Sequence, residues 1–118
     1  MAHLLLNQVT ATGKSASIFL DRATTDHTVE VDWLDPTNNI TALVAALEGS
    51  ISNRGVSDAD AVWTQLTSHT ASAGDITAEE FIFHVVNKPV TRVRINLSTL
   101  TGGAGAGDVV NARYIQGK

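Results

Sequence analysis

The chain of 118 residues contains no cysteine and only two prolines, and its apolar runs are short. The absence of cysteine excludes disulfides, thiol catalysis and cysteine metal sites. No stretch approaches the roughly 18–20 consecutive apolar residues of a membrane span. The first apolar run, Leu4-Leu5-Leu6, is too short for a signal sequence, and no basic segment precedes it. We therefore expect a protein that is made in a cytoplasm and does not enter a membrane.

Charge is also scarce in this sequence. Charged residues make up 17% of the chain, below the usual value of about 25%, and the formal net charge is −4. This balance argues against nucleic-acid binding, which needs clustered lysine and arginine, and against an anionic membrane surface. Thr, Ser, Asn, Gly and Ala take the place of the charged residues. Because depletion of Lys and Glu is typical of interfaces, the composition points to association with other proteins.

What the sequence does contain is a series of short segments with strand character. Turn-forming Gly, Pro, Asn and Asp divide the chain, and the pieces between them are rich in Val, Ile, Thr and aromatic residues. In the clearest piece, residues 91–98, Val93 and Ile95 point to one side while Arg92 and Arg94 point to the other. This alternation is typical of a strand with one buried and one solvated face. Similar segments lie at 4–9, 17–20, 27–33, 62–66, 80–86 and 109–115.

These segments predict an all-β chain, an antiparallel β-sandwich of two packed sheets with about eight strands in jelly-roll-like order. One segment, residues 40–49, does not fit by periodicity. Its apolar Ile40, Leu43, Val44 and Leu47 have helical spacing, and Asn39 and Gly49 could cap a helix. Periodicity alone therefore predicts a helix there, whereas the resemblance described next favours a strand.

Several motifs resemble those of small β-sandwich virion proteins of tailed bacteriophages. The motifs are LEGSI at 47–51, VWTQL at 62–66 after a polar loop, RVRINL at 92–97, TGG at 101–103 and ARYI at 112–115. The resemblance covers about residue 17 to the C-terminus, and it departs from the family pattern in a longer loop at 52–61. It implies a sandwich fold without catalytic residues. It also implies a capsid decoration (cement) protein or a tail or fibre component, often a homo-oligomer such as a trimer.

Motifs for chemistry are incomplete. The Gly-rich run 101–108 lacks the G-x-G-x-x-G spacing, and the segment 12–15 resembles the end of a Walker A loop but has Gln8 where the first Gly is required. The four histidines are scattered, so we expect them at the surface or at an interface. Asp58 and Asp60 could help to hold Ca²⁺, but no EF-hand pattern surrounds them. We expect no enzyme activity, no cofactor and no metal.

The two tryptophans separate two classes of function. An exposed tryptophan could stack on a sugar ring, as in a non-catalytic carbohydrate-binding module, whereas a tryptophan on an alternating strand more often fills the core. The patterns around Trp33 and Trp63 favour the core for both.

The chain is expected to divide into an N-terminal arm or edge strand, residues 1–15, and a β-sandwich domain, residues 16–118. The apolar start of the arm either pairs as an edge strand in its own domain or adds to a neighbour's sheet, and analogy with virion assemblies favours the second. Three arginines are expected on strands whose outer faces could adjoin, either solvated or in an interface. The candidate interface residues are Leu4, Leu5, Leu6, Arg92, Arg94 and Arg113.

The function predicted from these observations is that of a structural virion protein. The most specific form is a decoration protein that binds the outer capsid as a homo-oligomer, with the major capsid protein or another virion protein and itself as partners. The alternatives are a phage tail or fibre component and a carbohydrate-binding module. The predicted location is the virion, after synthesis in the host cytoplasm.

Overall fold

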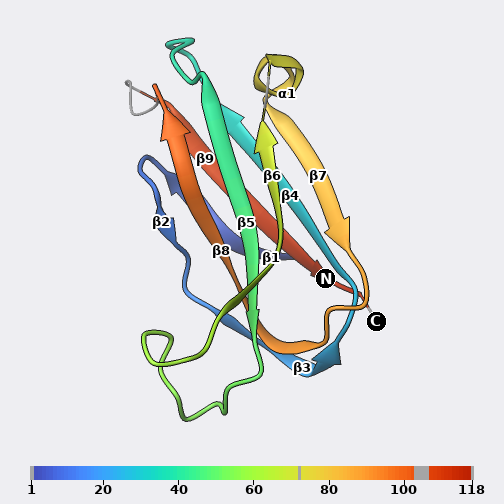
Figure 1. Cartoon of the computed structure of the whole chain (residues 1–118). Coiled ribbons are helices and arrows are strands. Elements are labelled where there is room, and N and C mark those ends of the chain that lie inside the picture. Colours follow the sequence, from blue (N-terminus) through green and yellow to red (C-terminus); the bar gives the residue numbers. More distant parts are fainter. Residues whose placement is uncertain (1, 72, 103–106, 118) are drawn as a thin grey trace.

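The computed structural model of the chain describes residues 2–71, 73–102 and 107–117. Strands dominate these residues (Figure 1). In chain order the elements are β1 (Ala2–Val9), β2 (Gly13–Lys14), β3 (Ile18–Thr24), β4 (His27–Leu34), β5 (Ala42–Ser50), β6 (Thr64–Ala71), α1 (Ala73–Ala78), β7 (Glu80–Val85), β8 (Val90–Thr101) and β9 (Val109–Gln116). No helix in the described part of the chain is long and apolar enough to span a membrane.

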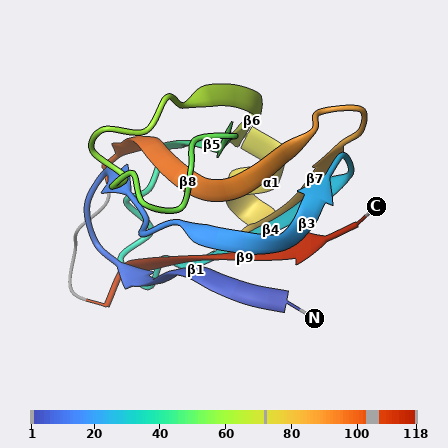
Figure 2. The same cartoon turned by 90° about the horizontal axis from the view of Figure 1, so that it is seen from below.

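The strands form two antiparallel sheets that lie one above the other (Figure 2). One sheet has the order β1-β9-β4-β7, and the other has the order β2-β8-β5-β6 with β3 also pairing with β8. Because β2 pairs with Asn96 and Leu97 and β3 with residues 90–93, the two short strands occupy successive parts of the same edge of β8. Taken as one interrupted strand, they complete an eight-stranded jelly roll. The predicted antiparallel β-sandwich is confirmed.

The core lies between the two sheets and follows the predicted alternation. In β8 the inward side chains of Val93, Ile95 and Leu97 are fully buried. The facing sheet contributes alternate residues of β4, including Trp33, which packs its ring against Phe81 at a centroid distance of 5.8 Å. The predicted core position of Trp33 is therefore confirmed.

Residues 40–49 contribute most of strand β5. The strand that the resemblance implied is therefore confirmed, and the helix that the spacing of the apolar residues predicted is wrong. β5 lies in the middle of its sheet, between β8 and β6. Its inward Leu43, Ala45 and Leu47 are buried, and so is Ala46 on the opposite side. A strand that is covered on both faces carries consecutive apolar residues, which hides the period of two.

The N-terminal segment forms β1 and pairs antiparallel with β9, so it is an edge strand of its own sheet. The favoured alternative, in which these residues add to a neighbour's sheet, is wrong for this structure. The physical reason is that Leu6 is buried in the core and Leu5 packs against it. Within the predicted arm 1–15, β1 joins one sheet and β2 joins the other.

Candidate interaction surfaces

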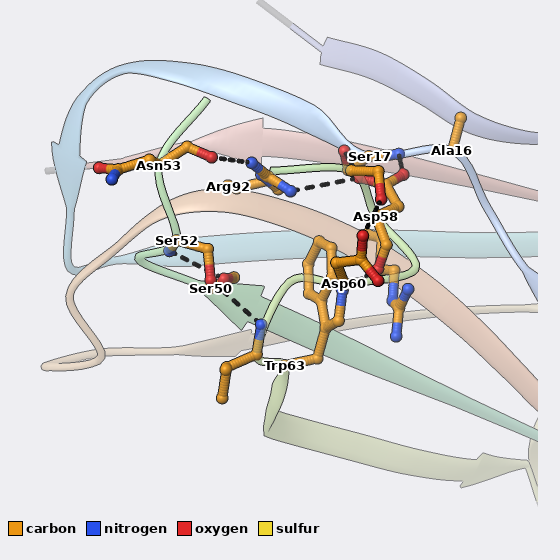
Figure 3. A network of polar contacts seen from close by, with 12 residues as sticks. Ala16, Ser17, Ser50, Ser52, Asn53, Asp58, Asp60, Trp63 and Arg92 are labelled. Atoms are coloured by element: carbon orange, nitrogen blue, oxygen red, sulfur yellow. Dashed lines mark hydrogen bonds and ion pairs between the residues drawn. The ribbon is translucent and has the colours of Figure 1, made fainter. Parts of the chain in front are cut away.

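The loop between β5 and β6, residues 51–63, folds over the outer face of the five-stranded sheet (Figure 3). Arg92 of β8 points out from this sheet, and the loop covers it so that 0% of the residue is exposed. Its guanidinium donates to the main-chain oxygen of Asn53 at 2.7 Å and lies 3.5 Å from a carboxylate oxygen of Asp58. It also stacks on the ring of Phe19, 4.3 Å from the centroid. Arg92 is therefore an internal anchor for the loop.

Asp58 joins the same loop to the connection between β2 and β3. Its carboxylate accepts hydrogen bonds from the hydroxyl of Ser17 at 2.6 Å and from the main-chain N–H of Ser17 at 3.1 Å. The Ser17 hydroxyl, followed by the Ser17 N–H and the charge of Arg92, holds the pKa of Asp58 below its ordinary value of 3.8. Asp58 is thus ionised at neutral pH, and its charge is used inside the chain.

Arg94 is held by a neighbouring set of contacts. Its Nε donates to Oε1 of Glu48 at 2.7 Å, and the ring of Trp63 covers its guanidinium at 4.0 Å. The Nε1–H of Trp63 donates to the main-chain oxygen of Asp58 at 2.9 Å. The prediction that Trp63 fills the core is wrong, because β6 begins only at Thr64 and Trp63 ends the covering loop on the outer face.

The prediction that Arg92 and Arg94 lie on a face open to solvent or partners is also wrong. The alternation of side chains along β8 did predict correctly that these two arginines point away from the core. They are buried because the loop of residues 51–63 crosses the outer face of the sheet. Alternation along a strand does not reveal that a distant loop covers its outer side. The one signal in the sequence was the length of this loop, since a connection longer than a tight hairpin has to pack on something.

The outer face of the β1-β9-β4-β7 sheet is a different kind of surface. One row of register partners crosses all four strands: Leu4 lies beside Arg113, Arg113 beside Glu30, and Glu30 beside Ile82. The two ends of this row are apolar and exposed, with Leu4 at 51% and Ile82 at 65%. We call this surface the four-stranded face; its main residues are Leu4, Glu30, Asp32, Ile82, Asn111, Arg113 and Ile115.

The centre of the four-stranded face is a network of paired charges. Arg113 makes ion pairs with Asp32 and, at 3.3 Å, with Glu30. Asn111 donates to Asp32 at 3.0 Å and accepts from the main-chain N–H of Gln8 at 2.8 Å. The hydrogen bond and charge of Asp32 are the main reasons why the pKa of Arg113 is raised. Since Arg113 already has two carboxylate partners in the chain, a protein bound here would meet apolar ends around a paired cation.

The six predicted interface residues are divided among three places. Leu4 and Arg113 come together on the four-stranded face. Leu5 and Leu6 pack in or against the core. The two arginines of β8 lie on the outer side of the other sheet, so they do not adjoin Arg113.

An apolar groove opens where β6 begins. Gly49, Leu66, Pro89 and Val90 are among the residues that line a space of about 370 Å³. A side chain at Gly49 would come within 2.7 Å of Val90, so the absence of one keeps the space open. Ile51 and Val62 also line the groove, and each is 76% exposed. Sequence reasoning did not identify this surface, because its residues come from three separate stretches of the chain, 49–51, 62–66 and 88–90.

One of the four histidines departs from the surface positions expected for them. His27 is buried, with Nδ1 2.6 Å from the hydroxyl of Tyr114 and Nε2 2.9 Å from the main-chain oxygen of Lys88. Its side chain points to the same side of β4 as Val29, which is a signal that could have identified it. His84, in contrast, is exposed as expected.

The segments considered for cofactors have structural roles where the structure describes them. Gly13 and Lys14 form β2. Gly102 has a φ of 77°, and a Cβ atom there would lie 2.0 Å from the main-chain oxygen of Asn39, so glycine is required. Residues 103–106 of the Gly-rich run lie outside the described residues. Asp60 accepts a hydrogen bond from Ser57, and the described residues contain no acidic or histidine cluster that could hold a metal.

Comparison with known proteins shows a shared fold. No family model and no curated protein matches the sequence. The structure is similar to SPBc2 prophage-derived protein YomS, with a TM-score of 0.58, 10% identity, and coverage of 99% of this chain and 92% of that chain. A chain of infectious bursal disease virus, Gx strain, gives a TM-score of 0.42 at 14% identity, covering 97% of this chain and 29% of that chain. A chain of an equine rhinitis A virus particle gives a TM-score of 0.46 at 7% identity, covering 97% of this chain and 66% of that chain. These two viral likenesses are too weak to support a functional inference.

Proposed function

We propose that this chain is a structural virion protein, and more specifically a capsid decoration protein that binds the outer shell as a homo-oligomer. The observation that carries the proposal is the jelly-roll order of the described strands, supported by structural similarity to a prophage-derived protein along 99% of this chain. Jelly rolls are characteristic of viral capsid and lectin domains. The partners of the proposed protein are the major capsid protein or another virion protein and further copies of itself.

The surfaces of the molecule support binding to other proteins. On the four-stranded face, exposed Leu4, Ile82 and Ile115 surround a cation whose charge is already paired. Covering such a face removes apolar area from water, and the Arg113 cation keeps its carboxylate partners, so no unpaired cation is buried. A protein that binds only the assembled shell stabilises that shell by mass action. Many identical sites on the shell increase the avidity of an oligomer.

The two tryptophans weigh against the carbohydrate-binding alternative. Trp33 is buried in the core, and Trp63 stacks on Arg94 while its N–H is bound to Asp58. The Trp33 ring therefore cannot reach a sugar, and Arg94 already covers one face of the Trp63 ring. The tail or fibre alternative uses the same kind of fold and differs only in where the protein lies on the particle.

The first experiment asks whether the protein is part of a particle and where. Purified protein is incubated with empty capsids of the phage that encodes it, and the pellet is analysed after sedimentation and by electron microscopy. We expect cosedimentation and added density on the outer shell. Density on the tail would favour the alternative, and absence from both capsids and virions would contradict the proposal.

A matched pair of variants tests the four-stranded face. Ile82→Glu places a charge at its apolar end, and we expect about a tenfold or larger loss of capsid affinity because that charge would be buried without a partner. Ser98→Glu, exposed on the other sheet, is the control and should bind as the unchanged protein does. Equal binding by both variants would show that this face is not the contact.

A further inference from the structure

β6 is an edge strand with unusual chemistry. It pairs with β5 on one side, and no described strand pairs with it on the other. Its sequence, TQLTSHTA, contains no charged residue and no proline. From Thr67 to Ala71 it pairs in unbroken register with β5, after an irregularity at Leu66. An uncharged, regular edge has main-chain N–H and C=O groups directed outward and is a template for another strand.

The other sheet edges carry the features that prevent such pairing. β3 carries Asp21 and Arg22 and shifts register along β8. β7 begins with Glu80. β1 is free of charged residues, but its register with β9 shifts twice, and Gln8 has a φ of 51°. Charges and bulges are the devices that natural edges use against pairing. Of the described edges, β6 contains no charged residue over its whole length and keeps an unbroken run of paired residues, whereas β7 keeps its register with β4 but starts with Glu80.

We propose that β6 pairs antiparallel with β6 of a second copy of this chain across a two-fold axis, joining two sheets into one. The proposal specifies the self-association that is part of the proposed function. A two-fold axis perpendicular to the sheet keeps the inner faces of both copies on the same side. Outward Ser68 and Thr70 of one copy then meet outward Ser or Thr of the other, and such pairs are favourable across strands.

A second copy fits this edge better than a foreign strand because of its neutrality. A two-fold contact brings a strand against itself, so a charge of either sign at the centre of the strand would face its equal. A foreign partner could instead use a charge of one sign on the edge. Because the whole chain has a net charge of −4, a neutral strand is also where two copies repel each other least.

The apolar groove continues the surface at the Thr64 end of the same strand. Exposed Ile51 and Val62 line this groove together with Thr64 and Leu66 of β6, so a copy docked on β6 that extends past Thr64 can cover them as well. Such burial adds apolar area to a contact that otherwise rests on main-chain hydrogen bonds, as in other interactions by strand addition.

The proposal is tested on the purified chain without capsids, by sedimentation velocity over a range of concentrations. We expect a reversible dimer of twice 12.5 kDa. Ser68→Lys places a charge on the edge of β6 and should weaken the dimer by about tenfold or more. His84→Lys makes the same change on exposed β7 and should leave it intact. Circular dichroism verifies that each variant is folded, and Thr70→Lys replaces Ser68→Lys if that variant is not.

Crosslinking tests the geometry independently, since the chain contains no cysteine. Under mild oxidation the double variant Ser68→Cys/Thr70→Cys should form a disulfide-linked dimer whether Ser68 faces Ser68 or Thr70 of the other copy, and His84→Cys should not. A monomer at all concentrations, a trimer, or a dimer that withstands Ser68→Lys would overturn the proposal. Because none of these assays uses a capsid, their failure is distinct from a failure of the protein to bind particles.

Discussion

Replacement of Asp58 by asparagine should destabilise the chain by about 1–3 kcal/mol, although the two side chains have the same shape. Asparagine has one side-chain oxygen, so it can keep the hydrogen bond from the Ser17 hydroxyl but loses both the charge and the hydrogen bond from the Ser17 main-chain N–H. What remains is Arg92, a cation with 0% exposure, with the main-chain oxygen of Asn53 as an acceptor. A buried cation that has lost its counter-charge is unfavourable.

The magnitude follows from the distance and the exposure. At the 3.5 Å between Arg92 and Asp58, two unit charges attract by about 5 kcal/mol at an effective dielectric constant of about 20. The carboxylate side chain is 39% exposed, so water already screens part of this attraction. The opposite change, Arg92→Met, leaves a carboxylate that water can reach and a side chain that can still pack on Phe19. It should therefore cost less, about 1 kcal/mol.

Urea denaturation of both single variants and the double variant tests this reasoning. We expect Asp58→Asn to be the least stable, and addition of Arg92→Met to recover part of the loss because it removes the unpaired cation. Asp60→Asn, in the same loop and exposed, is the control and should change stability by less than about 0.5 kcal/mol. If Arg92→Met lowers the free energy of unfolding more than Asp58→Asn does, or if the double variant is no more stable than Asp58→Asn, the charge pair does not hold the loop.

Two further outcomes follow from buried or paired groups. The hydrogen bonds of Ser17 lower the pKa of Asp58 in the folded chain. This carboxylate therefore contributes stability that is complete above its ordinary pKa of 3.8 and is lost as the pH falls through the lowered pKa. When stability is measured against decreasing pH, Asp58→Asn should lose less than the unchanged chain. Tyr114→Phe removes the hydroxyl beside buried His27 and should cost about 1–3 kcal/mol in thermal or urea unfolding, and a neutral result would mean that another group satisfies the histidine.

The alternation of side chains predicted the sandwich because the inner sides of β4, β8 and β9 are buried and their outer sides are not in the core. It could not predict what covers an outer side, since that depends on contacts between distant parts of the chain. Trp63 and Asp58 reach Arg94 and Arg92 only after the chain has folded. The groove at the start of β6 was missed for the same reason, whereas the burial of His27 was readable from its position beside Val29.

The use of the arginines changes how association of this chain should be understood. Arginine is enriched at binding hot spots, and on that basis Arg92, Arg94 and Arg113 were candidates for an interface. In the folded chain each of them is paired with one or more carboxylates of its own chain. A guanidinium that is already paired with a carboxylate of its own chain gains little by binding a carboxylate of another protein, because the internal ion pair has to break first. The surfaces proposed for contact with other proteins rest mainly on neutral groups: the apolar ends of the four-stranded face, the groove beside Val62, and the main chain of β6. A low content of charge is therefore consistent with a protein that associates through strand edges and apolar contacts.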